Sequence, residues 1–320
     1  MLSKTFGPLL GAALRVVGAA VLAGAAFGCA PALVGLREAG LPPRARVEGV
    51  PAFAQAEGHC GPAALAALLT WAGRPETPEA LAPLVFLPAR QGTLPIDLPR
   101  EIRARGLLAY TVRPEMGALL AEAAGGHPAL VLENQGLAAI PAWHYSVLAG
   151  YDLEGGTALL YSGAARPEEV RLATFAQTWG RGGRFALLAL PPGELPAGDD
   201  PDGVLSALAD LEEAHQFEPA ARGYESFLRR WPGDWRGAFG WGNALYALGD
   251  RARAEQALRR AHATDPDRPE PLNNLALLVF EQGRRGEAEA LARMAIENAV
   301  AAGLPADPYE QTLSEVTRGR

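Results

Sequence analysis

The sequence predicts an α+β domain followed by an all-α array of helix pairs. Three observations lead to this fold class. Between residues 49 and 190, apolar stretches of helical length alternate with short strand-like runs. A segment rich in Pro, Gly and Asp then interrupts this pattern over residues 191–203. Beyond that linker, similar residues recur every 34 positions, which indicates a repeated helical unit.

Composition limits the classes of protein to which the chain can belong. Of its 320 residues 49% are hydrophobic and 20% are charged, so about two folded domains are expected. The net charge of −7 argues against a nucleic-acid partner, which would require a basic surface. The two cysteines, Cys29 and Cys60, are too few for a disulfide scaffold or a four-thiolate zinc site. No metal site and no cofactor is predicted, because Cys and His residues show no ligand spacing.

Residues 1–28 have the pattern of a targeting segment. Basic residues precede the apolar run Val16–Phe27, which suits the core of a signal peptide and is too short to span a bilayer. Gly28 and Cys29 follow directly, and this order resembles the processing site of bacterial lipoproteins. The resemblance implies lipidation of Cys29 and a membrane anchor in the bacterial cell envelope, with the outer membrane facing the periplasm favoured. An ordinary secretory signal or a plain membrane anchor is the alternative.

The tether over residues 29–48 leads into the domain at 49–190, where helices and strands are both predicted. Ala63–Trp71 is rich in Ala and Leu and predicts a buried helix, and Leu98–Arg105 predicts an amphipathic one. The strands are predicted at Ala129–Leu132, Tyr145–Tyr151, Thr157–Tyr161 and 185–190, of which the second and third form a hairpin around a Gly-Gly turn.

The residues with reactive side chains gather around Cys60 and one distant histidine. Cys60 is expected to begin the buried helix, with Pro62 in its first turn. The unpaired amides and positive dipole end of a helix N-terminus favour the thiolate form of a cysteine. Gln55 could donate its amide to an oxyanion, together with the N–H of Cys60. His144 offers an imidazole base at the start of a strand, whereas His59 is expected only at the rim of the site.

The pattern Gln…Cys-Gly-Pro-Ala, followed downstream by His-Tyr-x-Val-x-x-Gly-Tyr-Asp, resembles papain-like cysteine peptidases of the type that processes bacteriocin leaders at double-glycine sites. The resemblance implies a papain-like α+β domain with Cys60 as nucleophile, His144 as base and Gln55 as oxyanion donor. In that family an aspartate follows the histidine and orients it. Here the corresponding stretch contains Ser162 and no carboxylate, so Ser162 or Asp152 is left as the third member.

Residues 204–302 carry the 34-residue period. Small residues at Gly242 and Ala276 recur in the first helix of each unit, and large ones at Tyr224 and Leu258 in the second. This resembles the tetratricopeptide pattern, in which a small residue lets two helices approach and a large one fills the gap. Three repeats are predicted, followed by a capping helix over residues 303–320 with Asp307 as its N-cap.

A concave surface on the first helices of the repeats would bind a protein partner or a peptide. The linker at 191–203 is expected to allow the two domains independent motion. In the alternative interpretation the repeats pack against the first domain and bury these residues there. The residues expected on the concave surface are Trp235, Phe239, Asn243, Asn273 and Val279.

The favoured function is an exported, lipid-anchored cysteine peptidase that hydrolyses a peptide or protein substrate through a thiolate–imidazolium pair. A papain-like domain followed by tetratricopeptide repeats is similar to a group of bacterial lipoproteins, in which the repeats would bind a partner or the substrate. Two alternatives stay open: a catalytically decayed scaffold that binds peptides, and a papain-like acyl transferase.

Overall fold

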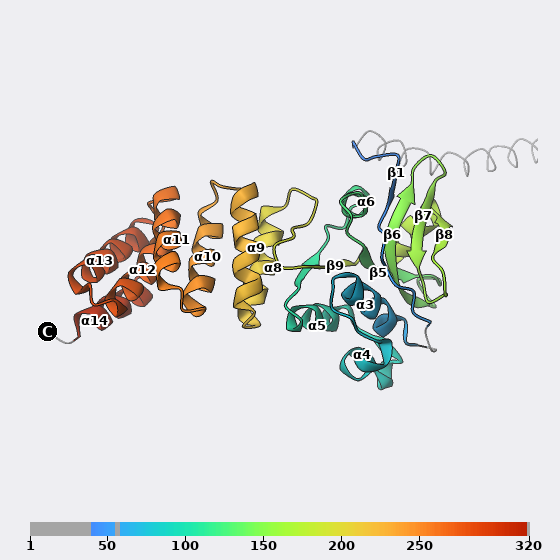
Figure 1. Cartoon of the computed structure of the whole chain (residues 1–320), viewed down its shortest axis with the longest axis horizontal. Coiled ribbons are helices and arrows are strands. Elements are labelled where there is room, and N and C mark those ends of the chain that lie inside the picture. Colours follow the sequence, from blue (N-terminus) through green and yellow to red (C-terminus); the bar gives the residue numbers. More distant parts are fainter. Residues whose placement is uncertain (1–39, 55–57, 319–320) are drawn as a thin grey trace, which may run out of the picture.

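The computed structural model describes residues 40–54 and 58–318, which form a mixed α/β part followed by a helical part (Figure 1). Helices precede most of the early strands of the first part, whereas β5 to β8 follow one another without an intervening helix. The strands are β1 (Arg44–Arg46), β2 (Phe86–Leu87), β3 (Gly92–Thr93), β4 (Leu108–Thr111), β5 (Ala129–Asn134), β6 (Trp143–Asp152), β7 (Thr157–Tyr161), β8 (Glu168–Arg171) and β9 (Ala186–Leu190). The helices are α3 (Cys60–Trp71), α4 (Pro78–Val85), η1 (Pro88–Arg90), η2 (Pro95–Asp97), α5 (Leu98–Ala104), α6 (Met116–Ala124) and α7 (Leu172–Arg181).

The main sheet is antiparallel and has the strand order β4-β9-β5-β6-β7-β8, with β1 added beside the far half of β6. The long strand β6 therefore pairs with β5, β7 and β1 and forms the centre of the domain. Its register with β5 places His144 opposite Glu133 and Tyr145 opposite Leu132. The predicted helices and strands of this part are confirmed, and together they give the α+β class.

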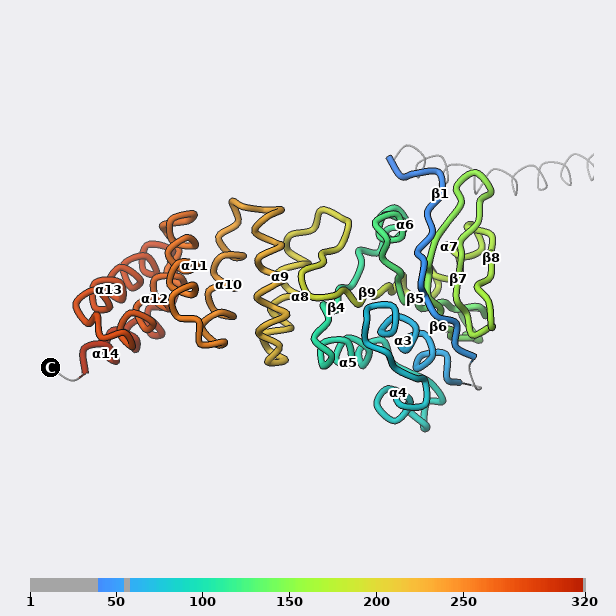
Figure 2. Tube along the Cα trace, in the orientation of Figure 1, coloured from blue at the N-terminus to red at the C-terminus, as the bar shows by residue number. Residues whose placement is uncertain are grey.

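Helices cover both faces of this sheet. Consecutive side chains of a strand point to opposite faces, so Leu132 and Tyr145 share one face while Glu133 and His144 share the other. Leu132 and Tyr145 line a cavity together with Cys60 of α3, which identifies the α3 face. Thr178 of α7 donates a hydrogen bond to Glu133, which identifies the α7 face. Figure 2 shows α3 and α7 on the two sides of the β5–β6 region.

Helix α3 is buried because it is apolar on every side. Residues Gly61 to Leu69 are all buried, and Leu65, Leu68 and Leu69 have no exposed surface. Such a helix must be enclosed by other elements, and α4, β3 and β6 enclose it. The N-terminal end of α3 is consequently held in one place relative to β6.

The helical part consists of antiparallel pairs that follow the predicted 34-residue period. Its helices are α8 (Pro201–Glu213), α9 (Phe217–Arg230), α10 (Trp235–Ala247), α11 (Arg251–Thr264), α12 (Pro269–Glu281), α13 (Arg285–Ala301) and the closing helix α14 (Asp307–Thr317). A Cβ atom on Gly242 would lie 2.8 Å from the Cγ of Leu258, so the small residue allows the close approach that was predicted. Asp307 is the first residue of α14, and Ala306 occupies the N-cap position instead.

The two parts share one hydrophobic core. The cluster that fills the sheet domain continues through Val204, Leu208 and Leu211 of α8 to Tyr224 and Phe227 of α9. Both helices contact β4, and α8 is also joined to α5 by an ion pair between Arg103 and Asp210 at 3.0 Å. The first helix pair therefore packs on the sheet domain, which the alternative interpretation expected of the repeats that carry the partner-binding residues, while those other pairs extend away from it (Figure 1).

The linker is held in place from both sides, which corrects the expectation of independent motion. From the sheet domain, the carboxylate of Glu122 accepts the N–H groups of Ala197 and Gly198 at 2.9 and 3.3 Å. From α9, Arg230 donates to the carbonyls of Pro196, Ala197 and Gly198 at 2.7 to 3.0 Å. The Pro, Gly and Asp content predicts a segment without helix or strand. It does not predict which side chains of the two neighbouring parts form hydrogen bonds with the backbone of that segment.

Candidate active site

Cys60 is the first residue of α3, as the sequence predicted. No side chain caps this end of the helix, so the amides of the first turn face the surroundings of the thiol. The next residue must be glycine, because a Cβ on Gly61 would lie 2.4 Å from the Oγ1 of Thr93. The strand β3 can therefore lie directly against the first turn of α3, and it forms a wall beside Cys60.

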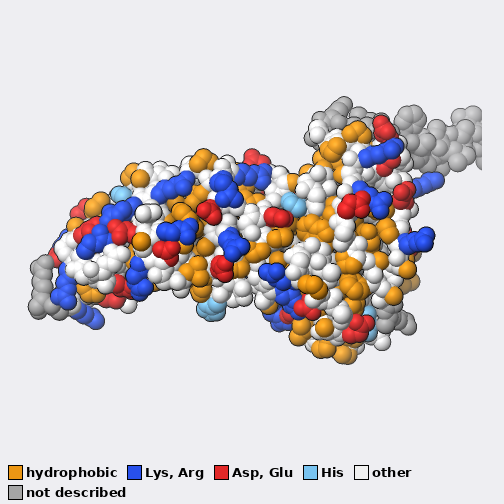
Figure 3. Space-filling model, in the orientation of Figure 1, with side chains coloured by type: hydrophobic (Ala, Val, Ile, Leu, Met, Phe, Trp, Pro, Cys, Tyr) orange, Lys and Arg blue, Asp and Glu red, His pale blue; other side chains and the backbone are white. Residues whose placement is uncertain are grey.

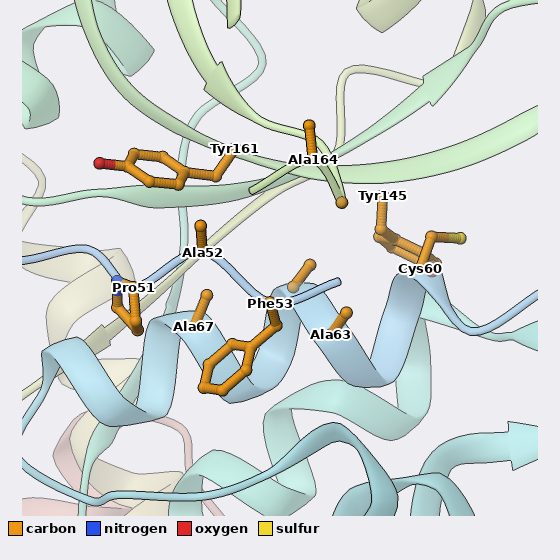
Figure 4. A pocket seen from close by; sticks show the side chains of 11 residues that line it. Pro51, Ala52, Phe53, Cys60, Ala63, Ala67, Tyr145, Tyr161 and Ala164 are labelled. Atoms are coloured by element: carbon orange, nitrogen blue, oxygen red, sulfur yellow. The ribbon is translucent and has the colours of Figure 1, made fainter. Parts of the chain in front are cut away.

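Cys60 opens into a cavity of about 570 Å³. Much of its lining is apolar, and Arg90 and Gln91 add polar groups. A second, much smaller space also borders Cys60, and it is lined by α3 together with Tyr161, Gly163 and Ala164. Figure 4 shows the side chains of Cys60 and Tyr145 next to each other at the first turn of α3. The residues that line the large cavity are Gly58, Cys60, Arg90, Gln91, Gly92, Thr93, Leu94, Pro95, Leu132, Trp143 and Tyr145.

Tyr145 and Trp143 are the residues of β6 that line this cavity. Its hydroxyl donates to the carbonyl of Thr93 at 3.2 Å, which connects β6 to β3 across the end of α3. Burial raises the pKa of Tyr145, with a smaller contribution from the neighbouring Cys60, so the phenol stays protonated at neutral pH. Tyr145 therefore acts as a neutral wall of the cavity and as a fixed support for the strand that carries His144.

His144 forms a hydrogen bond with Ser162, between Nε2 of the ring and the Oγ of the serine at 3.0 Å. Ser162 directly follows β7, the neighbour of β6 in the sheet, so two paired strands hold this contact. Of the two candidates for the third member, the structure brings Ser162 to the histidine. Among the described residues, no hydrogen bond joins the imidazole to Cys60. His144 lies on the α7 face of β6 and lines neither of the spaces next to Cys60, so the structure does not bring these two side chains together.

Asp152 lies far from the histidine and is excluded as its partner. It ends β6, eight residues after His144, which is a separation of about 26 Å along an extended strand. Its carboxylate accepts the amides of Glu154 and Gly155 and pairs with Arg44 at 3.0 Å. These contacts, the amide of Gly155 first among them, lower the pKa of Asp152. Asp152 therefore stabilises the hairpin turn, a role that follows from its position just before the Gly-Gly pair.

The electrostatic surroundings of His144 contain opposing influences. Burial lowers the pKa of the ring below its ordinary value, because the charged form loses hydration. The carboxylates of Glu133 and Glu168 and the contact with Ser162 act in the other direction. Glu133 was not among the residues that the sequence suggested. Its signal was a glutamate at the end of an otherwise apolar strand, and the pairing across the hairpin that brings it to His144 was not known.

Gln55 and Cys29 lie outside the described residues. The chain is described again from Gly58, and His59 stacks on Phe86 with ring centroids 4.5 Å apart, in keeping with its expected place at the rim. On the other side of the gap, Phe53 lines the small space next to Cys60. Within residues 40–54 and 58–318, no cluster of three or more candidate ligands suits a metal ion. No helix in the same ranges is long and apolar enough to cross a membrane.

The residues expected to bind a partner are divided between the surface and the core of the repeats. Trp235 and Phe239 of α10 contact each other with ring centroids 5.9 Å apart, and Arg268 lies over the Trp235 ring. Trp235 and Arg268 also border a cavity of about 620 Å³ at the α9–α10 turn. Val279, by contrast, has no exposed surface, because its side of α12 packs into the second hydrophobic core. The expectation that Val279 is exposed was wrong.

The asparagines of the first helices form a chain of amides. Asn274 donates to the Oδ1 of Asn243 at 2.8 Å, which links α12 to α10, and Asn273 donates to Asn274 at 3.3 Å. The Oδ1 of Asn273 is buried and has no hydrogen-bond partner among the described residues. An unpaired buried carbonyl is unfavourable, so a hydrogen-bond donor that reached this atom would stabilise it.

No protein-family model matches this sequence, and no curated protein matches it. Solved structures that are similar include the translocator chaperone SycD of Yersinia enterocolitica, with 18% identity, a TM-score of 0.35, and coverage of 37% of this chain and 92% of that one. The TPR2B domain of yeast Sti1 in complex with pHsp70 has 18% identity and a TM-score of 0.36, covering 38% and 98%. The Sgt2 TPR domain of Aspergillus fumigatus has 19% identity and a TM-score of 0.35, covering 38% and 79%. The tetratricopeptide character of the helical part rests on the period and packing of its own helices.

Proposed function

We propose that the chain is a papain-like cysteine peptidase with Cys60 as its nucleophile, His144 as its base and Gln55 as a donor to the oxyanion. The observation that supports this proposal best is the position of Cys60 at the exposed amide end of a buried helix, where it opens into the 570 Å³ cavity. A cavity beside a thiol at a helix N-terminus suits a substrate carbonyl that must approach the sulfur.

In the proposed reaction the ring of His144 first turns from the α7 face of β6 toward the start of α3 and takes the proton of the Cys60 thiol. The thiolate then attacks the carbonyl carbon of a peptide bond. The N–H of Cys60 and the amide of Gln55 stabilise the oxyanion. The imidazolium then protonates the leaving amine, and a thioester to Cys60 remains. Water, deprotonated by His144, hydrolyses that thioester to release the acid. The hydrogen bond from Nε2 to Ser162 orients the ring and leaves Nδ1 to exchange the proton.

The lining of the cavity favours an apolar substrate side chain next to the scissile bond. Leu94, Pro95, Leu132 and the rings of Trp143 and Tyr145 supply apolar surface, and burial of such surface contributes about 25 cal/mol per Å². Arg90 and Gln91 line the same cavity and supply polar groups that bind the peptide backbone in this proposal. The proposed substrate is therefore an extended peptide with an apolar residue near the cleaved bond.

Labelling with iodoacetamide between pH 4 and 9 tests the proposed pair of Cys60 and His144. We expect the midpoint of labelling in the full chain well below the value of about 8.5 for a free thiol, and a shift toward that value in His144→Ala. Cys60→Ser is the control for site-specific labelling, and it must also remove peptide hydrolysis. A midpoint near 8.5 that His144→Ala does not change would refute the pair.

We propose that the repeats bind a peptide segment of a partner or of the substrate. The unpaired Oδ1 of Asn273 and the cavity bordered by Trp235 and Arg268 support this role. Asn273→Ala should weaken the binding of a selected peptide to the Cys60→Ala chain, as measured by fluorescence polarisation. The matched control is Asn298→Ala, whose amide donates to the carbonyl of Pro266 at the outside of the array. Equal binding by both variants would contradict the proposal.

We propose that Cys29 carries a lipid that anchors the protein in the bacterial cell envelope, facing the periplasm from the outer membrane. The Gly28-Cys29 pair after the apolar run supports this proposal. Incorporation of labelled palmitate and sensitivity of processing to globomycin should both disappear in Cys29→Ser. A membrane-bound mature protein of unchanged size in Cys29→Ser would contradict it.

A non-catalytic scaffold is the second candidate, and the serine at position 162 favours it. A hydroxyl orients an imidazole but supplies no charge to stabilise the imidazolium, so a decayed enzyme could carry this exchange. The scaffold predicts peptide binding by the repeats together with ordinary labelling of Cys60. The peptidase predicts hydrolysis that depends on both Cys60 and His144.

A further inference from the structure

Glu133 is a buried acid that the proposed reaction does not yet use. Only 4% of its surface is exposed, and both carboxyl oxygens accept hydrogen bonds from hydroxyl groups. Ser146 of β6 donates to Oε2 and Thr178 of α7 donates to Oε1, each at 2.6 Å. Buried acids are generally paired with a cation. Among the described residues, however, no arginine or lysine forms an ion pair with Glu133.

His144 is the group placed to balance this charge. It lies directly opposite Glu133 in the β5–β6 register, where Cβ atoms of paired residues are about 4.5–5.5 Å apart. The two side chains share the α7 face of the sheet with Ser146, the residue two positions further along β6. The hydroxyls of Ser146 and Thr178 hold the carboxylate in place beside the strand that carries the imidazole.

We propose that Glu133 is a positioning residue that supplies the negative charge for the His144 imidazolium, in the role that a carboxylate at position 162 has in similar peptidases. The inference rests on the proposed function. The protonated ring would lose hydration in its partly buried site, and Ser162 carries no charge to offset that loss. Glu133 offsets it through space from the neighbouring strand, while Ser162 orients the ring.

Other charged groups near the ring come from two more elements. Glu168 of β8 acts in the same direction as Glu133 but is exposed, so solvent screens it more. Arg181 of α7 donates its Nε–H to the backbone carbonyl of Asn134 at 3.1 Å and forms no ion pair with Glu133. Among the described residues, Glu133 is therefore the buried carboxylate that lies opposite His144 on the same face of the sheet.

Two neutral variants test this role. Glu133→Gln keeps the shape of the side chain, and Glu133→Met replaces the buried acid by an apolar side chain of similar volume, a change that proteins often tolerate. The hydroxyl of Thr178 keeps a bond in both variants, because it also lies 3.0 Å from the carbonyl of Phe175. The test can be carried out if at least one of the two variants folds.

The first measurement is the titration of His144 by NMR in the full chain, with the ring signal assigned from its absence in His144→Ala. We expect either neutral variant to lower the pKa of His144 by about one unit, since a nearby carboxylate raises a histidine pKa by about that amount or more. The matched control is Glu122→Gln, since Glu122 is equally buried but contacts His127. It should leave the titration of His144 unchanged. An unchanged His144 titration in a folded Glu133 variant would overturn the inference.

The second measurement is the pH profile of Cys60 labelling in the same variants. If Cys60 and His144 form an ion pair, loss of the Glu133 charge destabilises the imidazolium and moves the labelling midpoint toward the value of a free thiol. A lowered pKa of His144 with an unchanged labelling profile would support the role of Glu133 and contradict the proposed Cys60–His144 pair. A change in both would support the inference and the proposed function together.

Discussion

The hydrogen bond between His144 and Ser162 orients the imidazole ring, but a serine cannot stabilise the protonated ring by its charge as a carboxylate would. The hydroxyl lies 3.0 Å from Nε2 and orients the ring between two paired strands. It adds no net charge, so burial determines the direction in which the pKa of His144 moves. A carboxylate at this position would both orient the ring and stabilise its protonated form.

Ser162→Asp should therefore raise the pKa of His144, by about 1–2 units for a carboxylate in contact with the ring. The folded state would then bind a proton at His144 more strongly, so its stability relative to wild type would be greatest below the lowered pKa of the wild-type histidine and fall as pH rises through the new value. NMR titration of His144 measures the shift directly. Ser162→Asn, which adds the same bulk without charge, is the control and should leave the pKa within a few tenths of the wild-type value.

At the scale of the element, the repeats depend on glycines that allow helices to approach closely. A Cβ on Gly240 of α10 would lie 2.3 Å from the ring of Tyr224 in α9. That ring is buried, and its hydroxyl is held by Glu212 at 2.5 Å, so it has little freedom to move away. The contact fixes how the first and second helix pairs pack on each other.

Gly240→Ala should destabilise the protein by about 1–3 kcal/mol, because the clash with Tyr224 outweighs the higher helix propensity of alanine. Gly286→Ala in α13 is the matched control, since a Cβ at Gly286 would have no neighbour within 4 Å. It should leave stability unchanged or raise it by up to about 1 kcal/mol. Urea unfolding followed by circular dichroism distinguishes the two results, and equal stability of both variants would show that Tyr224 can move.

The helices of the repeats could be predicted from the sequence because their period is local. The pairs Gly249 and Gly283 both adopt positive φ, at 81° and 82°, at the turn inside their repeats. The corresponding position of the first repeat is His215, which has the same conformation at φ 56° without being a glycine. The sequence pattern of the first repeat is therefore harder to recognise, although its backbone adopts the same conformation.

The candidate site could be predicted only in part. The start of α3 at Cys60 followed from the Gly-Pro pair and the apolar run behind it. Glu133, and the choice of Ser162 rather than Asp152, depend on strand register across loops and turns. A shift of one residue in register would move each side chain to the other face of the sheet, and apolar patterning does not determine register at the strand ends.

At the scale of the whole molecule, the sheet domain and the repeats form an elongated shape joined by a short, well-bonded segment (Figure 3). Acidic and basic side chains are intermixed along the repeats in this view, without a long patch of one sign. The joint involves the shared core as well as the linker, because α8 and α9 pack on β4. Both features oppose bending between the two parts.

Cleavage after Glu194 by a glutamate-specific protease should therefore be slow in the native chain, although Glu194 is exposed. Arg230→Ala removes the donor to three linker carbonyls and should accelerate cleavage about tenfold, as expected for loss of a contact worth about 1.4 kcal/mol. Arg222→Ala is the control, since the guanidinium of Arg222 pairs with Glu218 on the same helix. Cleavage that is rapid in all three proteins would show that the linker opens freely.

A linker that is hydrogen-bonded to both parts of the molecule fixes the distance between the repeats and the sheet domain as well as connecting them. A peptide held at Asn273 of the repeats would meet Cys60 at a constant separation, because neither part can swing toward the other to shorten the path. The substrate itself would then have to supply the missing length between its docking segment and its scissile bond. The cleaved bond would then be set by the number of substrate residues between the docking segment and the scissile bond. Inserting or deleting residues between these two parts of the substrate would change which bond is cut.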